Sequence, residues 1–460
     1  MIQRLRARWK QWRSSLWLVP AGMVLGAFVG ALGMIQLSAF VPREMLIRFP
    51  RLFGADAQSS RSMLSTIAGS MATIAGVTFS ITVVAVAQAS TQYTSRILRN
   101  FLSDRPSQVV LGMLAGTFVY CLVLIRTIRG DADLLFIPGL GVLGAFVLAI
   151  LSIGFLVYFI HHIAESLQAS HVLARVRRET IAVIDRLYPD ALAESMPHSA
   201  TTRDTAGLHW RWTNAQASGY LQQVDGDALA AWASQRNAVV RLDYRIGDYI
   251  VDGTPLLATA SRDPDVTDHI PSGDSPDAER PLLEACTIGA YRTIDDDASF
   301  GIQQVVDIAN KALSPGINDA TTAVAAIDTL CAILVRLGSR CTTLPARIVD
   351  GVERVIQAGH SYEEFVSIGL DQLRRNASAD VGVSVHLMRV IARIIAATPC
   401  ETRRTLLLAS ADLLRDASSR RAEVAADGLA IDAAHAQARL TAVTAVTAEP
   451  GHAVPEPSTW

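Results

Sequence analysis

The feature that most constrains this chain is a set of four long apolar runs before residue 161. They lie at about residues 16–40, 63–89, 108–125 and 134–160. A helix needs roughly 20 apolar residues to cross the hydrocarbon core of a bilayer, and each run has about that length. A helix also satisfies its backbone polar groups internally, as lipid requires. The sequence therefore predicts an α-helical integral membrane protein whose transmembrane domain covers residues 1–161 and has four transmembrane helices.

Basic residues are distributed unevenly around these runs. Eleven lie in the N-terminal arm, the second link and the segment after the fourth run, against six in the other two links. Cytoplasmic links are enriched in Lys and Arg, so both termini are predicted to be cytoplasmic. The first run is about 25 residues long, whereas a signal peptide has an apolar core of roughly 7–15, so we expect this run to be retained.

The second run carries small and weakly polar residues at steps of three and four. They fall on one face of a helix: Ser62, Thr66, Gly69, Thr73, Gly76 and Ser80. Such a face can line a pore, with neighbouring subunits closing the ring. It can equally be a packing surface, because Gly, Ala, Ser and Thr are common where membrane helices meet. No run holds a charged residue or His before its end, which disfavours an ion-coupled carrier.

Glycines four residues apart occur in two other runs. Gly22, Gly26 and Gly30 form one set, and Gly112 and Gly116 form another, both predicted to let helices approach closely. Gly139, Gly141 and Gly144 spell a GxGxxG pattern, but a dinucleotide site needs a preceding strand. Here the pattern opens a membrane run, which favours helix packing.

The remainder of the chain is predicted to be a cytosolic α+β part. A helical apolar period continues to Pro189, so residues 162–189 are predicted to extend the fourth span as a rod, or to lie on the bilayer as an amphipathic helix. Short strand-like runs predict a small β-rich, barrel-like domain at 205–260. Residues 281–425 read as a helical domain, with one helix expected at about 345–358, and residues 440–460 as a disordered tail.

The sharpest motif of this part is Ser314-Pro315-Gly316-Ile317-Asn318-Asp319. Proline and glycine end one helix, and Asn318 or Asp319 can cap the next. A structural corner is the simpler explanation, and a binding loop for a partner is the alternative.

Other chemical candidates are weak. Asp295, Asp296 and Asp297 lack metal-ligand spacing and suit a helix N-terminus better. His161 and Glu165 share a helix face, but an exposed cluster at the membrane surface explains them. His360 and His386 have no partner nearby in sequence.

Several classes of protein are disfavoured. The five scattered cysteines indicate neither a disulfide framework nor a zinc site. The sequence contains no catalytic motif, so we expect no enzyme activity, no cofactor and no metal site. A net charge of −2 gives no reason to expect nucleic acid as a partner.

Two segments resemble a known family. They are GVTFSITVVAVAQASTQYTSRILRNFLSDRPSQVVLGMLAGTFVYCLVLIRTIR and FGIQQVVDIANKALSPGINDATTA. The chain is similar over about residues 10–425 to bacterial predicted membrane proteins grouped as domain of unknown function 2254. That family usually has proline after the final Asp of SPGIND, whereas Ala320 stands here. The resemblance implies a multi-pass inner-membrane protein with a cytosolic C-terminal part, and it implies no activity.

Two functions remain open on these observations. The first is an oligomeric ion or small-solute channel lined by the Ser/Thr/Gly face of the second span, which implies a homo-oligomer in the lipid bilayer. The alternative is a non-conducting membrane scaffold or regulator whose cytosolic part binds an unknown protein or ligand.

Overall fold

The chain forms two compact units, Met1–His171 and Val172–Trp460, which are considered separately below. The computed structural model describes residues 17–40, 57–92, 105–128, 138–190, 208–262, 276–342, 347–349 and 351–447. The predicted N-terminal arm and the three links between apolar runs fall largely outside these residues.

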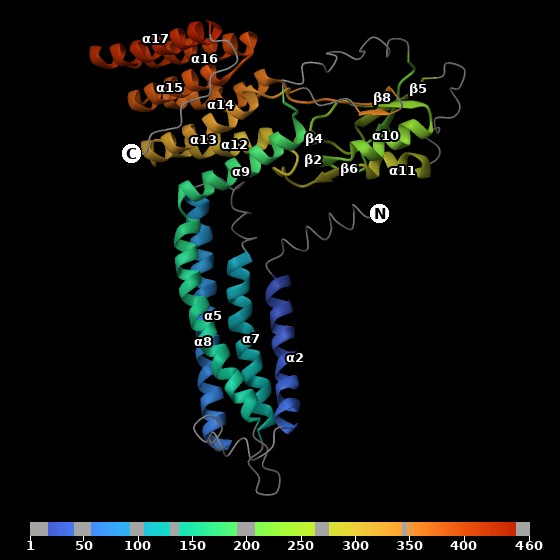
Figure 1. Cartoon of the computed structure of the whole chain (residues 1–460), viewed down its shortest axis with the longest axis vertical. Helices are drawn as coiled ribbons and strands as arrows, with labels where there is room; N and C mark the ends of the chain where they lie inside the picture. The colour runs from blue at the N-terminus through green and yellow to red at the C-terminus, as the bar shows by residue number, and fades with distance from the viewer. Residues whose placement is uncertain are drawn as a thin grey trace. The chain divides into compact units, whose positions relative to one another are not determined.

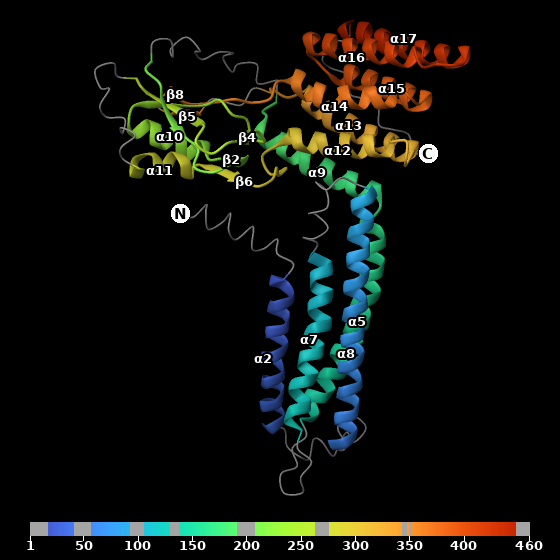
Figure 2. The same ribbon diagram turned by 180° about the vertical axis from the view of Figure 1, so that it is seen from behind.

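The first unit is a bundle of long apolar helices. Its members are α2 (Leu18–Phe40), α5 (Ala57–Gln92), α7 (Arg105–Thr127) and α8 (Gly139–Ser166). They run side by side in both views (Figures 1 and 2). The helix α7 contacts each of the other three, and α8 also contacts α2 and α5. Its central place explains why α7 is the most buried of the four.

Polar contacts inside the bundle are made by hydroxyl groups. The hydroxyls of Thr117 and Ser152 lie 3.0 Å apart between α7 and α8. Tyr120 donates to the carbonyl of Gly141 at 3.1 Å. Both contacts satisfy polar groups away from water, where an unpaired group is costly.

Five helices of the described chain are long and apolar enough to cross a membrane. Four correspond to the predicted spans, and the fifth is α13 (Ala320–Gly338) in the second unit. The sequence analysis predicted four spans, whereas five described helices have the length and composition of a span. The helical extension of the fourth span is interrupted: α8 ends at Ser166 and α9 (Ala169–Leu187) begins three residues later.

The second unit contains two sheets among its described strands. A five-stranded sheet has the order β1-β5-β3-β8-β7, in which only β3 and β8 are parallel. A three-stranded antiparallel sheet has the order β4-β2-β6. The strands are β1 (Arg211–Asn214), β2 (Gly219–Val224), β3 (Ala238–Leu242), β4 (Tyr249–Ile250), β5 (Pro255–Ser261), β6 (Cys286–Gly289), β7 (Arg347–Val349) and β8 (Val352–Gln357).

This arrangement differs from the barrel-like region predicted for 205–260. The strands beyond residue 281 complete both sheets, so the β part is built from distant segments. The helix expected at 345–358 is wrong, because β7 and β8 occupy its place. Residues 352–357 read VERVIQ, and in the sheet Val355 packs into the core while the flanking residues are less buried.

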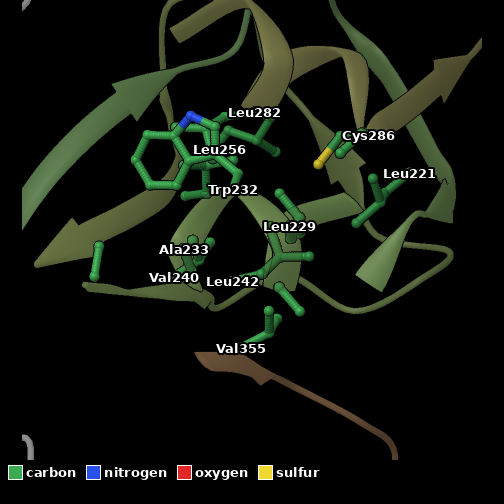
Figure 3. Packing of buried hydrophobic residues seen from close by; sticks show 14 of the residues in the cluster. Leu221, Leu229, Trp232, Ala233, Val240, Leu242, Leu256, Leu282, Cys286 and Val355 are labelled. Atoms are coloured by element: carbon green, nitrogen blue, oxygen red, sulfur yellow. The ribbon is translucent and has the colours of Figure 1, made fainter. Parts of the chain in front are cut away.

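A hydrophobic core joins this sheet region to two short helices, α10 (Gly226–Gln235) and α11 (Pro276–Glu284). Figure 3 shows Trp232 and Leu229 of α10 lying among Leu256, Leu282 and Val240. Truncating a buried Trp of this kind to Ala costs about 3–5 kcal/mol.

The rest of the second unit is helical. After α9 come α12 (Ala298–Ala312), α13 (Ala320–Gly338), α14 (Tyr362–Ala377), α15 (Val381–Ala397), α16 (Glu401–Ser419) and α17 (Ala425–Thr447). The helix α13 packs against α12, α14 and α15. Residues 440–447, predicted to begin a disordered tail, are the last two turns of α17, and residues 448–460 lie outside the described chain.

Candidate functional site

The Ser/Thr/Gly face of α5 lies on the outside of the first unit. Ser62, Thr66, Gly69, Thr73, Gly76 and Ser80 are all exposed. The buried face of α5, with Leu64, Met71 and Ala85, is about 180° around the helix from this set at 3.6 residues per turn. Packing among the described residues therefore does not account for the small and polar residues on the exposed face.

The hydroxyls of this face bond to their own helix. Thr66 donates to the carbonyl of Ser62 at 2.9 Å, and Thr73 to that of Gly69 at 3.0 Å. Each threonine oxygen keeps lone pairs that can accept from water or coordinate a cation. The face is thus weakly polar, and these two hydroxyl donors are satisfied within the helix.

A groove borders one end of this face. Its volume is about 710 Å³, and both α5 and α8 line it. The first turns of α5 contribute the polar part, with Gln58, Ser59, Ser62 and Thr66. The helix α8 contributes an apolar wall with Phe146, Ile150 and Ile153.

The two glycine sets behave differently. A Cβ on Gly112 would lie 3.0 Å from the Cα of Pro20, and one on Gly116 would lie 3.3 Å from the Cβ of Ala27. Close approach of α7 to α2 therefore uses both glycines. By contrast, Gly22, Gly26 and Gly30 are exposed and have no neighbouring atom within 4 Å of an added Cβ. The glycines at the start of α8 also meet α7, with Gly141 against Leu124 and Gly144 against Tyr120.

The SPGIND segment joins α12 to α13. The backbone N–H groups of Ile317 and Asn318 both donate to the carbonyl of Ser314, and that of Asp319 donates to Ala312. Asn318 has a positive φ of 48°, a conformation that Asn tolerates better than most residues. The side chain of Asp319 then caps α13 by accepting from the N–H of Thr322 at 3.0 Å and from its hydroxyl at 2.5 Å. Pro315 and Gly316 are exposed at the tip.

The weaker candidates have structural roles. Asp297 caps α12 by accepting from the N–H of Phe300, and Arg292 pairs with it at 2.6 Å. His161 lies 3.3 Å from Glu165, both exposed. His386 bonds to Asp328 at 2.9 Å. Within the described residues, no three His, Cys, Asp or Glu side chains gather as a metal site would require.

The second unit contains a cavity that the sequence did not predict. It has a volume of about 440 Å³ and is lined by α9, both sheets, and the first residues of α10 and α12. Its ionisable side chains are Arg186, Arg245, Arg347, Asp296, Asp297, His360 and Tyr188. Arg186 pairs with Asp296 at 2.6 Å, Arg245 with Glu364 at 2.6 Å, and Arg347 with Asp227 at 3.3 Å.

His360 is the unusual group of this cavity. Its side chain is 16% exposed, and neither ring nitrogen has a hydrogen-bond partner among the described residues. The nearest carboxylate oxygen, on Glu364, is 3.7 Å from Nδ1. Burial lowers the pKa of His360, and Arg245 lowers it further, although Asp297, Glu364 and Asp248 act in the opposite direction.

Sequence reasoning missed the cavity because its residues are far apart in the chain. Arg186 comes from α9, Arg245 from the turn before β4, Arg347 from β7, and His360 from the segment before α14. Helix prediction over 345–358 also assigned Arg347 to the wrong element. The capping-box pattern at Ser361 and Glu364 was the available signal that a helix begins directly after His360.

Comparison with known proteins gives a family and no activity. The family model described as "Predicted membrane protein (DUF2254)" matches residues 13–393. An uncharacterized protein of Mycobacterium tuberculosis (strain CDC 1551 / Oshkosh) is 30% identical over all of this chain and 86% of its own length. An uncharacterized protein of Mycobacterium bovis (strain ATCC BAA-935 / AF2122/97) is similar to the same extent. No solved structure matches the chain. The match over most of the chain confirms the resemblance found from the SPGIND and second-span segments: this protein belongs to the predicted membrane proteins of domain of unknown function 2254.

Proposed function

We propose that this protein is an oligomeric channel for ions or small solutes, in which the exposed face of α5 lines the pathway. The observation that carries the proposal is that this face is polar and small-sided although it points away from the rest of its own bundle. A helix surface against lipid has no use for Gly69, Thr73 and Gly76 in register. If several copies of the chain surrounded a common axis with this face of α5 turned inward, the face would line a water-filled pore.

The proposal has four membrane crossings and both termini in the cytoplasm of a bacterial inner membrane. We assign α13 to the soluble part because it carries two charged residues that pair within the second unit. Arg336 lies 2.6 Å from Asp185, and Asp328 lies 2.9 Å from His386. If α13 crossed the membrane, these charged side chains would lie in the hydrocarbon core, where removing them from water costs much free energy.

The exposed glycines of α2 provide a second surface for assembly. Gly22, Gly26 and Gly30 form a small-xxx-small face that meets no other part of the described chain. Such faces let helices from two subunits approach closely. We assign this face to a contact between copies, outside the conducting pathway.

Conductance of the reconstituted protein tests the proposal. Purified protein in planar bilayers with KCl is expected to give single-channel currents. Thr73→Leu and Gly76→Leu are expected to reduce the current strongly, because they add bulk to the proposed wall. Phe79→Leu is the matched control, since Phe79 is also exposed on α5 but lies about 100° around the helix from this face. Absence of current, or equal currents in all three variants, contradicts the channel.

Cross-linking tests the assembly independently of conduction. A cysteine at Thr73 is expected to give disulfide-linked dimers in membranes after mild oxidation, whereas one at Phe79 is not. If dimers form and no current is seen, the non-conducting scaffold becomes the better explanation. That alternative is favoured by one observation, the polar cavity of the second unit, which gives the soluble part a site of its own.

A further inference from the structure

We propose that the cavity of the second unit binds a small phosphate monoester, with the phosphate held by arginines and the uncharged part of the ligand against His360. A cavity of about 440 Å³ lies within the range of roughly 300–1,000 Å³ that small-molecule sites occupy. This inference is independent of conduction by the first unit.

The charged groups of the lining favour an anion. Three arginines line the cavity against two aspartates. Asp297 is almost fully buried, at 2% exposure, and is already bound by Arg292 and by the N-terminus of α12. Asp297 therefore does not compete for the arginines of the lining, whose carboxylate partners are Asp296, Glu364 and Asp227.

The arginines have donors to spare. A guanidinium carries five N–H groups, and a single carboxylate partner accepts at most a bidentate pair. Arg186, Arg245 and Arg347 are 57%, 37% and 51% exposed, so their ion pairs are accessible and can be shared with an incoming anion. Arginine also matches the geometry of phosphate oxygens.

Two helix N-termini add to the preference. Gly226 and Ala298, the first residues of α10 and α12, both line the cavity. One N–H group at each end is already bound by a capping carboxylate, that of Asp225 in α10 and that of Asp297 in α12. The remaining N–H groups of the first turn and the helix dipole favour a further anion there. Gly226 also lets Arg347 approach closely, because a Cβ there would lie 3.0 Å from the Arg347 Nε atom.

His360 indicates that the ligand has more than a phosphate. Buried polar atoms usually have hydrogen-bond partners, and both ring nitrogens of His360 lack one in the described chain. The ring packs against Phe365, with centroids 5.4 Å apart, which holds its orientation. Because burial lowers its pKa, the ring is neutral near pH 7 and carries one donor and one acceptor, both without a partner among the described residues.

Isothermal titration of the full-length protein in a phosphate-free glycoside detergent tests the site. The probes are inorganic phosphate, adenosine 5′-monophosphate as a phosphate monoester, and adenosine as its uncharged counterpart. We expect the monophosphate to bind at least tenfold more tightly than either phosphate or adenosine. Arg347→Gln should weaken the binding of monophosphate and phosphate at least tenfold, whereas His360→Leu should weaken the binding of the monophosphate and leave that of phosphate unchanged.

Arg375→Gln is the matched control, because Arg375 is an exposed arginine of α14 that does not line the cavity. Each variant is first compared with the wild type by thermal unfolding. Arg347→Gln is expected to leave the melting temperature unchanged, because the side chain of Arg347 is half exposed. Failure of both phosphate and monophosphate to bind overturns the proposal. Equal effects of Arg347→Gln and Arg375→Gln also overturn it, since the binding would then be unspecific. Unchanged monophosphate affinity in His360→Leu removes His360 from the site.

Discussion

At the scale of single residues, the contact between α9 and α12 depends on the absence of one side chain. Gly301 of α12 faces Thr180 of α9, and both residues are buried. A Cβ on Gly301 would overlap the Thr180 hydroxyl and would lie 2.9 Å from the Thr180 Cβ. That hydroxyl is also held in place, because it donates to the carbonyl of Val176 at 2.7 Å.

Gly301→Ala is therefore expected to destabilise the second unit although alanine favours helices. Overpacking of a buried contact costs about 1–3 kcal/mol, which exceeds the gain of roughly 0.5–1 kcal/mol from replacing glycine inside a helix. Gly428→Ala in α17 is the control, because no atom lies within 4 Å of its added Cβ, and it is expected to be neutral or stabilising. Urea unfolding followed by tryptophan fluorescence measures both. An equal effect of the two substitutions would contradict the contact.

Single residues also show where sequence reasoning fails. The exposed face of α5 could be predicted because helical spacing alone sets which residues share a side. The cavity could not, because Arg186, Arg245 and His360 are separated by tens of residues and meet only through tertiary packing. His360 appeared to be isolated in sequence for the same reason.

At the scale of elements, the corner between α12 and α13 rests on the Asp319 cap. The pKa of Asp319 is lowered, first by the hydrogen bond from the Thr322 hydroxyl and then by that from its backbone N–H. Both bonds stabilise the ionised carboxylate at the helix N-terminus. The corner is thus explained by local bonds, which supports the structural explanation of SPGIND over a binding loop.

Substitution of Asp319 should make stability depend less on pH. A carboxyl whose folded pKa is depressed contributes stability that is fully present above its ordinary value of about 3.9 and is lost as pH falls through the folded value. Asp319→Ala is expected to cost about 1 kcal/mol at pH 7, as lost caps typically do, and the deficit should shrink below about pH 4. Asp319→Asn, which keeps a capping oxygen, should cost less at pH 7. Urea midpoints at pH 7 and pH 3.5 check this, and a deficit of Asp319→Ala that is the same at both would contradict it.

The elements differ in how well the sequence predicted them. The ends of the four long apolar helices lie within six residues of the predicted ends, since a run such as 18–40 has no alternative that satisfies its backbone in lipid. The segment 345–358 was misassigned because a short apolar run fits a helix or a strand equally well. One of the two strands that pair with β8 is β3, which lies more than a hundred residues earlier, and the other is β7, which lies inside the misassigned segment itself.

At the scale of the whole molecule, the number of membrane crossings is set by α13. This helix is as apolar as a membrane span, yet Leu330, Ile333 and Leu334 on its surface are fully buried against neighbouring helices. A helix that satisfies its apolar face within a bundle needs no lipid around it. The proposed topology therefore places the residues before and after α13 on the same side of the membrane.

Labelling on both sides of α13 decides between four and five crossings. Cys400 follows α13 and is exposed, whereas Cys121 and Cys286 are buried. Cys331 and Cys341 are half-buried and are replaced by serine in every protein that is labelled. A Gln216→Cys, Cys400→Ser variant moves the exposed thiol to a position before α13. With four crossings, a membrane-impermeant maleimide should label Cys400, and the cysteine at position 216, only in inverted vesicles. An Asp133→Cys, Cys400→Ser variant places the thiol in the link after α7, and this thiol should be labelled only in right-side-out vesicles. Opposite labelling of positions 216 and 400 would mean that α13 crosses the membrane, because a single crossing between them reverses the side on which the second is exposed.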